Sequence, residues 1–428
     1  MENKTQTEKN SILRSVLATS KRWILGITFI LIAVFMELVL VTDLSTTDVT
    51  TFATNIDANA IQIPDWIFNS RLGLHITAGF CAGLGVFQLV RGLKKRTGTL
   101  VGVVGVLVVL GFLIWGAAGS SISITGMLAV MVVRSVPITI GALSGILCER
   151  AGIVNIAIEG MMISGAFAGA VIASLLGLWA GLLAAIITGA LLALVHAVLS
   201  IKYKVDQIIS GTMINIFSSG LTSYLYLKFL QTPENAYLNQ SGFFKPFAIP
   251  LLSKIPVIGP IFFNHNIFIY VMYILVIVLS IALFNTKWGL RHRAMGEYPK
   301  AADTLGVNVF RTRYLACLLS GAVAGLGGAY FSLGSVGRFE QTMTAGRGFI
   351  ALAAMIFGNW TPIGSLGAGM LFGFAESLTT KLSILRFPIP AEVLLMLPYI
   401  ITIVVLAGVV GRSRGPASSG TPYEKESL

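Results

Sequence analysis

The sequence predicts an all-α membrane protein, a polytopic helical bundle of about ten transmembrane spans. Three observations predict this fold class. Hydrophobic residues make up 55% of the 428 residues and charged residues only 11%, whereas soluble domains average about 25% charged residues. The mean hydropathy is +0.84. Apolar runs of about 20 residues, the length at which a helix crosses a bilayer, recur along the chain.

Ten apolar segments are long enough to be predicted as spans. The first follows Lys21 and Arg22, and it is too long for a signal peptide and lacks a small-residue cleavage site. Short polar or basic stretches separate most of the later spans, and 229–264 and 286–312 are longer loops. The predicted spans are about 23–42, 72–90, 98–117, 125–147, 156–176, 178–199, 208–228, 265–285, 313–335 and 391–410.

One further apolar stretch, 348–381, does not fit a simple span. It is interrupted at 358–364, where the sequence reads Gly-Asn-Trp-Thr-Pro-Ile-Gly. We predict a broken re-entrant hairpin here, because irregular backbone at membrane depth is tolerated where protein buries it or where it lines a cavity. Two helices joined by an ordinary turn are the alternative.

The positive charge of the chain predicts its orientation in the membrane. The net charge is +12, yet the basic residues stand at the ends of apolar runs and form no stripe, which argues against a nucleic-acid partner. Of the 30 Lys and Arg, 21 lie in the two terminal segments and four alternate loops, the longest of which is 286–313. The positive-inside rule then predicts that both termini are cytoplasmic.

The sequence has one match to a catalytic motif, GxSxG at 411–415, and we interpret it as chance because it lies in a basic, Ser/Pro-rich tail with no strand before it. No phosphate-binding GxxxxGK[ST] and no HExxH occurs. Cys81, Cys148 and Cys317 stand inside apolar stretches, where we expect small core residues and neither disulfides nor a metal site. We therefore predict no catalytic residue, no metal ligand and no cofactor bound by this chain.

Polar residues within the apolar segments are candidates for a transport path, because a charge at the bilayer centre costs about 2.5–3.5 kcal/mol on insertion scales. Asn155 and Glu159 are four residues apart and share a helix face. Asn215 stands in a later span, and Asn359 and Trp360 stand in the broken hairpin. Structural bonding between helices is the alternative for Asn155 and Glu159, and a position at the membrane interface is the alternative for Trp360.

The loop 286–313 has the pattern of a short helix outside the membrane. Pro299 suits the first position of a helix, and Gly306 suits a helix end. A solvated loop helix is one interpretation, and a docking helix for a cytoplasmic motor is the other.

The sequence of this loop resembles the coupling loop of ABC-importer permeases, in the branched-chain amino acid/ribose/nucleoside permease superfamily. The resemblance extends over about 125–410 and is closest to the nucleoside, or simple-sugar-type, permeases. It rests on the loop block and on three further blocks, which read MGEYPKAADTLG at 295–306, ERAGIVNIAIEGMM at 149–162, LSGAVAGLGGAY at 319–330 and MTAGRGFIALAAMIFG at 343–358.

The resemblance implies an importer subunit that is not itself an enzyme. A cytoplasmic ABC ATPase binds ATP and Mg²⁺ and grips the loop; a second, non-identical permease and an extracytoplasmic substrate-binding lipoprotein complete the machine, in the plasma membrane of a prokaryote. Tyr298 departs from the family, whose loops usually have Asn there, and Asn is the better cap. By this likeness the coupling residues are Gly296, Glu297, Pro299, Ala301, Ala302 and Gly306.

The chain is divided by this resemblance, by the predicted spans and, for its tail, by composition. We expect a cytoplasmic segment at 1–22, an extension with three spans at 23–124, a permease core at 125–410 that contains the coupling loop, and a disordered tail at 411–428. Nucleosides are the expected cargo, and Trp360 has a π-face on which a base could stack. A simple sugar such as ribose or galactose, a branched-chain amino acid, and an ion-coupled carrier without an ATPase are the alternatives.

Overall fold

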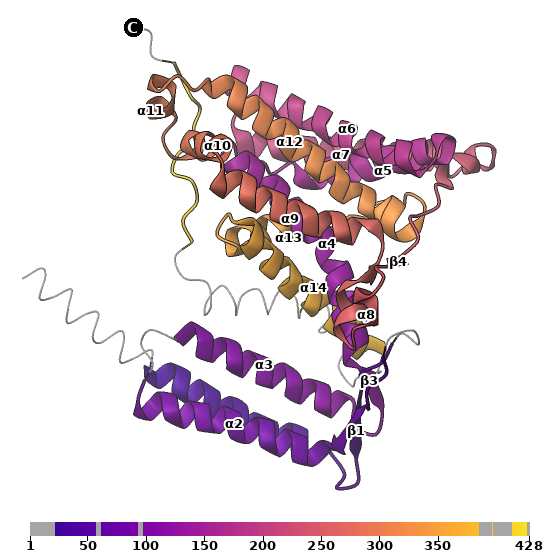
Figure 1. Cartoon of the computed structure of the whole chain (residues 1–428), viewed down its shortest axis with the longest axis vertical. Coiled ribbons are helices and arrows are strands. Elements are labelled where there is room, and N and C mark those ends of the chain that lie inside the picture. The colour runs from indigo at the N-terminus through magenta and orange to yellow at the C-terminus, as the bar shows by residue number, and fades with distance from the viewer. Residues whose placement is uncertain (1–21, 57–60, 93–96, 385–395, 397–412, 426–428) are drawn as a thin grey trace, which may run out of the picture. The chain divides into compact units, whose positions relative to one another are not determined.

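A computed structural model describes residues 22–56, 61–92, 97–384, 396 and 413–425, and it divides the chain into two compact units (Figure 1). The first unit comprises residues 1–127 and 378–411, and the second comprises 128–377 and 412–428. Each unit is mainly helical, and the helices are long and apolar.

The described part of the first unit consists of three long helices and a small sheet. Strand β1 pairs antiparallel with β2, where Val49 lies opposite Asn69, and parallel with β3, where Thr51 lies opposite Ser121. The all-α prediction missed this sheet because its strands are only three to five residues long. The elements are the helix Arg22–Val41 with its π-helical end η1 (Met36–Val41), β1 (Val49–Ala53), β2 (Trp66–Asn69), α2 (Ser70–Val90), α3 (Thr97–Gly116) and β3 (Ser121–Ser123).

The second unit contains most of the remaining helices. Helix α4 (Ile124–Glu149) begins within the first unit and α14 (Pro362–Ile384) ends there. The other elements are α5 (Ile158–Leu176), α6 (Leu178–Ala197), η2 (Val198–Lys202), α7 (Gln207–Leu225), η3 (Tyr226–Leu230), η4 (Pro233–Asn239), β4 (Phe247–Ala248), η5 (Leu252–Lys254), α8 (Ile258–Phe262), β5 (Asn264–His265), α9 (Ile267–Asn285), α10 (Lys287–Glu297), α11 (Pro299–Thr304), α12 (Val309–Ala329), η6 (Tyr330–Val336) and α13 (Arg347–Phe357).

Eight helices among the described residues are long and apolar enough to cross a membrane, and they coincide with eight of the ten predicted spans. The predicted span 208–228 forms α7, which is not one of the eight. The predicted span 391–410 lies outside the described residues, apart from Met396. The structure therefore confirms a polytopic helical membrane protein.

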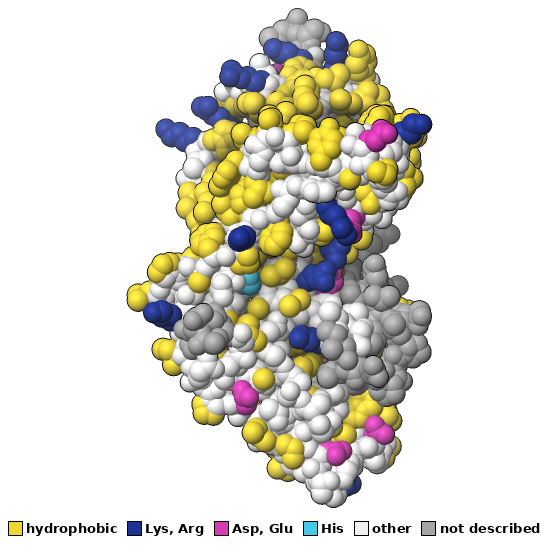
Figure 2. Space-filling model, turned by 90° about the vertical axis from the view of Figure 1, so that its right-hand side faces the viewer, with side chains coloured by type: hydrophobic (Ala, Val, Ile, Leu, Met, Phe, Trp, Pro, Cys, Tyr) yellow, Lys and Arg dark blue, Asp and Glu magenta, His cyan; other side chains and the backbone are white. Residues whose placement is uncertain are grey.

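The exposed face of α6 is apolar. Leu183, Ile187 and Leu191 of α6 are each more than half exposed, as lipid-facing side chains are in an isolated chain. On the face drawn in Figure 2, hydrophobic side chains are numerous and charged side chains stand in small groups.

Close approach of backbones joins α5, α6 and α12, and glycine residues at the contacts make it possible. A Cβ atom at Gly325 would lie 2.1 Å from the carbonyl oxygen of Ala185, and one at Gly189 would lie 2.2 Å from that of Gly321. Only glycine fits at these two positions, so α6 and α12 can lie directly against each other.

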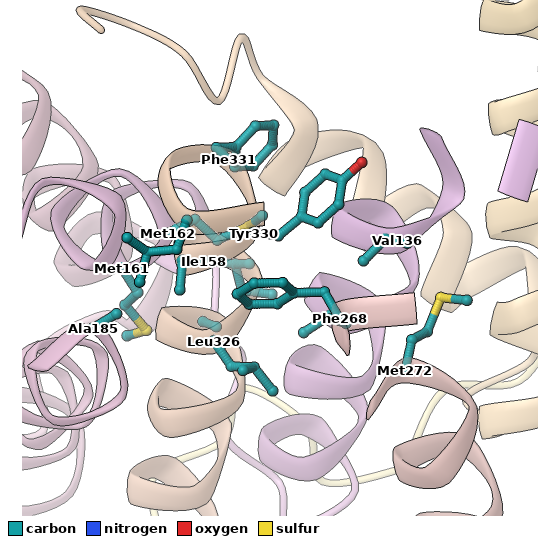
Figure 3. Packing of buried hydrophobic residues seen from close by; sticks show 14 of the residues in the cluster. Val136, Ile158, Met161, Met162, Ala185, Phe268, Met272, Leu326, Tyr330 and Phe331 are labelled. Carbon is teal, nitrogen blue, oxygen red and sulfur yellow. The ribbon is translucent and has the colours of Figure 1, made fainter. Parts of the chain in front are cut away.

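The core of the second unit lies between α4, α5, α9 and α12. Figure 3 shows Phe268 of α9 in its middle, with Met162 of α5 on one side and Tyr330 above it. The Phe268 and Tyr330 rings meet edge to face, with centroids 5.9 Å apart. The Tyr330 hydroxyl donates to the carbonyl oxygen of Val133 on α4 at 2.8 Å, so this buried polar group is satisfied.

The apolar stretch 348–381 is interrupted where the sequence predicts. Helix α13 ends at Phe357 and α14 begins at Pro362. Between them Asn359 and Trp360 both have φ +52, in the left-handed region. Residues other than glycine rarely adopt this backbone conformation, so contacts with surrounding residues must stabilise it.

The described part of the C-terminal tail is ordered, which differs from the predicted disorder of 411–428. Within residues 413–425, Pro416 and Tyr423 are buried. Composition misled the prediction, because the Ser/Pro-rich tail has no periodic apolar pattern. Its order comes from hydrogen bonds to residues more than 100 positions away, among them Tyr423 to Asp303.

Candidate functional site

The coupling segment, residues 286–313, comprises the short helices α10 and α11 and the first residues of α12. Pro299 is the first residue of α11, and Gly306, with φ +82, follows the helix end. Both features confirm the helix that the sequence predicts. Tyr298 makes no side-chain capping bond to α11, as its departure from Asn led us to expect. Helix α10, by contrast, is capped by Thr286, whose hydroxyl accepts from the Gly289 N–H at 3.1 Å.

Burial divides the six predicted coupling residues into two groups. Gly296, Pro299 and Ala302 are buried, and they fix the segment to the second unit. A Cβ atom at Gly296 would lie 2.5 Å from the carbonyl oxygen of Arg150, so glycine is required there. The exposed members are Glu297, Ala301 and Gly306.

Two large apolar side chains extend the exposed face of the coupling segment. Tyr298 is 62% exposed and Leu305 is 84% exposed, one at each end of α11. Apolar side chains in such a position are typical of a surface that binds another protein. The coupling segment therefore has one face held by the chain and one face open.

A polar cluster, which we call the Arg150 junction, lies beside the coupling segment. The Arg150 guanidinium donates to the carbonyl oxygens of Trp360 at 3.1 Å and Asn359 at 3.2 Å, and it lies 4.0 Å from the Glu297 carboxylate. The Trp360 indole N–H donates to the Glu149 carboxylate at 2.6 Å. Burial lowers the pKa of Arg150, an effect that Glu297 opposes; guanidinium nonetheless stays charged. The junction ties α4, the α13–α14 turn and α10 together.

The other end of α13 is bound to α5 through Glu159. One carboxylate oxygen accepts from the Thr344 hydroxyl at 2.6 Å and the Gly346 N–H at 2.9 Å, and the second accepts from the Gly348 N–H at 2.6 Å. The first N–H groups of a helix have no partner within it, and a negative charge there is favourable. Glu159 thus caps α13 from another helix.

Asn155 and Asn215 support the irregular backbone that precedes α5. The Asn155 amide donates to the Ser320 hydroxyl at 2.9 Å and accepts from the Ala157 N–H at 3.0 Å. Asn215 accepts from the Gly160 N–H at 2.7 Å and donates to the Ile156 carbonyl oxygen at 2.8 Å. Buried backbone groups outside a helix require such partners.

The five predicted path residues therefore fall into two places. Asn155, Glu159 and Asn215 lie around the start of α5, whereas Asn359 and Trp360 belong to the Arg150 junction. Trp360 is 8% exposed and its indole faces Glu149. Helix α13 joins the two places, because its first turn contacts Glu159 and the turn after it contacts Arg150.

An ion cluster within the apolar helices was not selected from the sequence. The Arg347 guanidinium lies 3.0 Å from the Glu376 carboxylate and Arg134 lies 4.0 Å from it. Arg347 also lies 5.7 Å from the centroid of the Phe331 ring. Arg134 stands near the middle of α4, and its side chain is 43% exposed. The signal in the sequence was a charge far from either end of an apolar helix, which is costly unless it pairs or faces water.

Comparisons with known proteins identify the family. The family model for the permease component of the branched-chain amino acid transport system matches residues 127–406. The guanosine ABC transporter permease protein NupQ of Bacillus subtilis is 41% identical over 306 residues, which are 68% of this chain and 94% of NupQ. No solved structure matches the chain.

Two further relatives are named for different substrates, one for nucleosides and one for glucose. The nucleoside ABC transporter permease protein NupC of Lactococcus lactis is 39% identical over 69% of this chain and 95% of its own. The putative glucose ABC transporter permease protein TsgC13 of Haloferax volcanii is 35% identical over 60% of this chain and 77% of its own. Because the family model covers more than half of the sequence, this chain belongs to the permease components of the branched-chain amino acid transport system family.

Proposed function

We propose that this chain is the membrane-spanning subunit of an ATP-driven importer of nucleosides. The observation that carries the proposal is the similarity to two nucleoside permeases, 41% and 39% identical over nearly their whole length. The permease named for glucose is less similar, at 35%, and covers less of both chains. In this proposal the chain has about ten spans and a re-entrant hairpin, with both termini in the cytoplasm.

The open face of the coupling segment is where we expect the first of the partners to bind. A cytoplasmic ABC ATPase would bind α11 and its flanks, where Tyr298 and Leu305 are exposed, and ATP and Mg²⁺ would be held by that partner. A second permease chain and an extracytoplasmic binding lipoprotein would complete the importer. The chain itself supplies the path and the coupling surface and catalyses no reaction.

Coupling would run through α13. Movement of the coupling segment changes the position of Glu297 relative to Arg150, which holds the Asn359 and Trp360 carbonyls at the end of α13. The other end of α13 is fixed to α5 by Glu159 and begins with Arg347 of the ion cluster. A displacement at the ATPase would thus reach the middle of the membrane through one short rigid helix.

The ion cluster is the part of the path that we propose meets the cargo. Arg134 lies near the middle of a spanning helix with nearly half of its side chain exposed, a position that favours a water-filled cavity. Asn155, Glu159 and Asn215 would shape the path by fixing backbone. Arg134→Met should then abolish most uptake, whereas Arg134→Lys should retain part of it; equal uptake by wild type and Arg134→Met would remove Arg134 from the path.

Uptake competition tests the cargo. Membranes that contain the chain with its native partners should take up labelled guanosine in the presence of ATP. Excess uridine or adenosine should reduce this uptake and ribose or glucose should not. Competition by sugars alone would replace the nucleoside assignment by the sugar alternative, and uptake without any ATPase in the purified complex would favour an ion-coupled carrier.

A further inference from the structure

The C-terminal residues 413–425, which we call the strap, lie against the buried side of the coupling segment. The strap begins at the Arg150 junction, where the Arg414 N–H donates to the Asn359 side-chain oxygen at 3.2 Å. It then passes the end of α10 and reaches Asp303 on α11 through Tyr423. Figure 1 shows this part of the chain, in yellow, beside α10 and α11.

The middle of the strap satisfies the end of α10. The Ser418 N–H donates to the Gly296 carbonyl oxygen at 2.8 Å, and the Ser418 hydroxyl lies 2.8 Å from the same oxygen and 3.1 Å from the Met295 carbonyl oxygen. These carbonyl groups have no partner within α10, because the last four of any helix lack one. The Ala417 N–H faces the Glu297 carboxylate at 3.4 Å. The Tyr298 N–H donates to the Ala294 carbonyl oxygen at the end of α10, and the strap supplies donors for the next two carbonyl groups.

The end of the strap is attached to α11 and α12. The Tyr423 hydroxyl donates to the Asp303 carboxylate at 2.7 Å. Its ring packs edge to face on Phe310, with centroids 5.5 Å apart, and belongs to the buried cluster of Met295, Ala302 and Val309. Two further hydrogen bonds hold the strap between Ser418 and Tyr423. The Gly420 N–H donates to the Gly152 carbonyl oxygen at 3.2 Å, and the Arg313 guanidinium donates to the Thr421 carbonyl oxygen at 3.2 Å.

The strap leaves the open face of the coupling segment uncovered. Tyr298 and Leu305 remain 62% and 84% exposed with the strap in place, while Gly296 and Ala302, on the held face, are buried. A covering segment that blocked a partner would bury the exposed group. Apart from the Ala417 N–H, which faces the Glu297 carboxylate, the strap contacts the buried side of α10 and α11.

We propose that the strap positions the coupling segment for the ATPase, and that Ser418 and Tyr423 are its positioning residues. This inference rests on the proposed coupling function. Without the two hydroxyl groups, α10 and α11 lose their fixed orientation, so ATP hydrolysis continues but is less often converted into a movement of the permease.

The test compares import with ATP hydrolysis in the complete transporter, purified with its partners and reconstituted in liposomes. Ser418→Ala with Tyr423→Phe removes both hydroxyl groups and keeps the aromatic packing. The number of nucleosides imported per ATP should fall at least about fivefold, because the loss of even one hydrogen bond is worth about that factor. Ser418→Thr, which keeps both hydroxyl groups, should retain the wild-type number of nucleosides imported per ATP. A ratio unchanged in the double variant would overturn the inference.

Two further measurements separate the inference from the proposed function. Glu424→Gln removes an exposed ion pair with Lys204 at the far side of the strap and should leave the ratio unchanged; a fall equal to that of the double variant would overturn the assignment to Ser418 and Tyr423. Amide hydrogen exchange of residues 295–306 needs no transport. Exchange should be faster in the double variant. Equal exchange would refute the positioning role of the strap, even in a complex that imports no nucleoside.

Discussion

At the scale of single residues, Glu159 and Asn215 in the apolar helices bind mainly backbone groups. Glu159 accepts three hydrogen bonds and Asn215 makes two, all to residues on other elements. Sequence reasoning found these residues, because a polar group in an apolar run is costly. It did not find their partners, because these lie 55 to 189 positions away along the chain. Nothing local in the sequence distinguishes a residue that contacts cargo from one that caps a distant helix.

Replacement of Glu159 by glutamine tests its capping role. The amide keeps one oxygen for Thr344 and Gly346 but directs an N–H₂ group toward the Gly348 N–H, which loses its acceptor. A buried donor without a partner costs about 1–3 kcal/mol. We expect a lower unfolding temperature of the purified chain in detergent, with uptake reduced in proportion to the folded protein. A normal unfolding temperature with abolished uptake would instead place Glu159 on the path.

The acid sensitivity of the coupling segment depends on His292. Its ring N–H donates to the Leu147 carbonyl oxygen at 2.8 Å, and burial lowers its pKa to about 4. The unfolded chain binds a proton near pH 6.5 and the folded chain only near pH 4. Stability therefore falls as the pH is lowered from 6.5 to 4, and is unaffected by this group at higher pH.

The His292→Gln variant isolates that contribution. Glutamine can still donate to Leu147 and does not titrate. The wild type should lose about 2 kcal/mol of unfolding free energy through His292 between pH 7 and pH 5, so the unfolding temperature of the variant should fall less over this interval. Parallel curves for the two proteins would show that His292 is not buried in its neutral form.

At the scale of elements, the predicted boundaries were best where local chemistry sets them. Pro299 and Gly306 delimit α11, and Gly358 to Pro362 separates α13 from α14. The strands β1–β3 and the strap were missed, since both depend on pairing with distant residues such as Ser121 and Asp303. Helix propensity and hydropathy carry no information about such pairing.

The packing of α6 against α12 gives a prediction at this scale. Gly325→Ala would place a methyl group against the Ala185 backbone. Because backbone cannot move aside as a side chain can, we expect a loss of about 1–3 kcal/mol in unfolding free energy. Gly220→Ala is the matched control, since its Cβ would meet open space, and alanine there should stabilise α7 by about 0.5–1 kcal/mol. Equal thermal stability of the two variants would contradict the close helix contact.

At the scale of the whole molecule, we propose that the second unit connects an ATPase-binding face to the interior of the membrane. The open face is formed by the coupling segment, and the connection runs through the Arg150 junction and α13 to Glu159 and the ion cluster. The family and the approximate spans could be predicted from the sequence. The route could not, because it consists of contacts among α4, α5, α10, α13 and α14 that only the fold brings together.

The most direct test of this account measures uptake and ATP hydrolysis together in the reconstituted importer with Arg150→Gln. Arg91→Gln, an exposed arginine in the first unit, is the control and should behave as wild type. The account predicts that the Arg150 variant assembles with the ATPase and hydrolyses ATP, while nucleoside uptake per ATP falls at least about tenfold, the scale of losing hydrogen bonds to a charged group. Uptake per ATP equal to that of the control would show that the Arg150 junction does not transmit the movement, and would contradict the account.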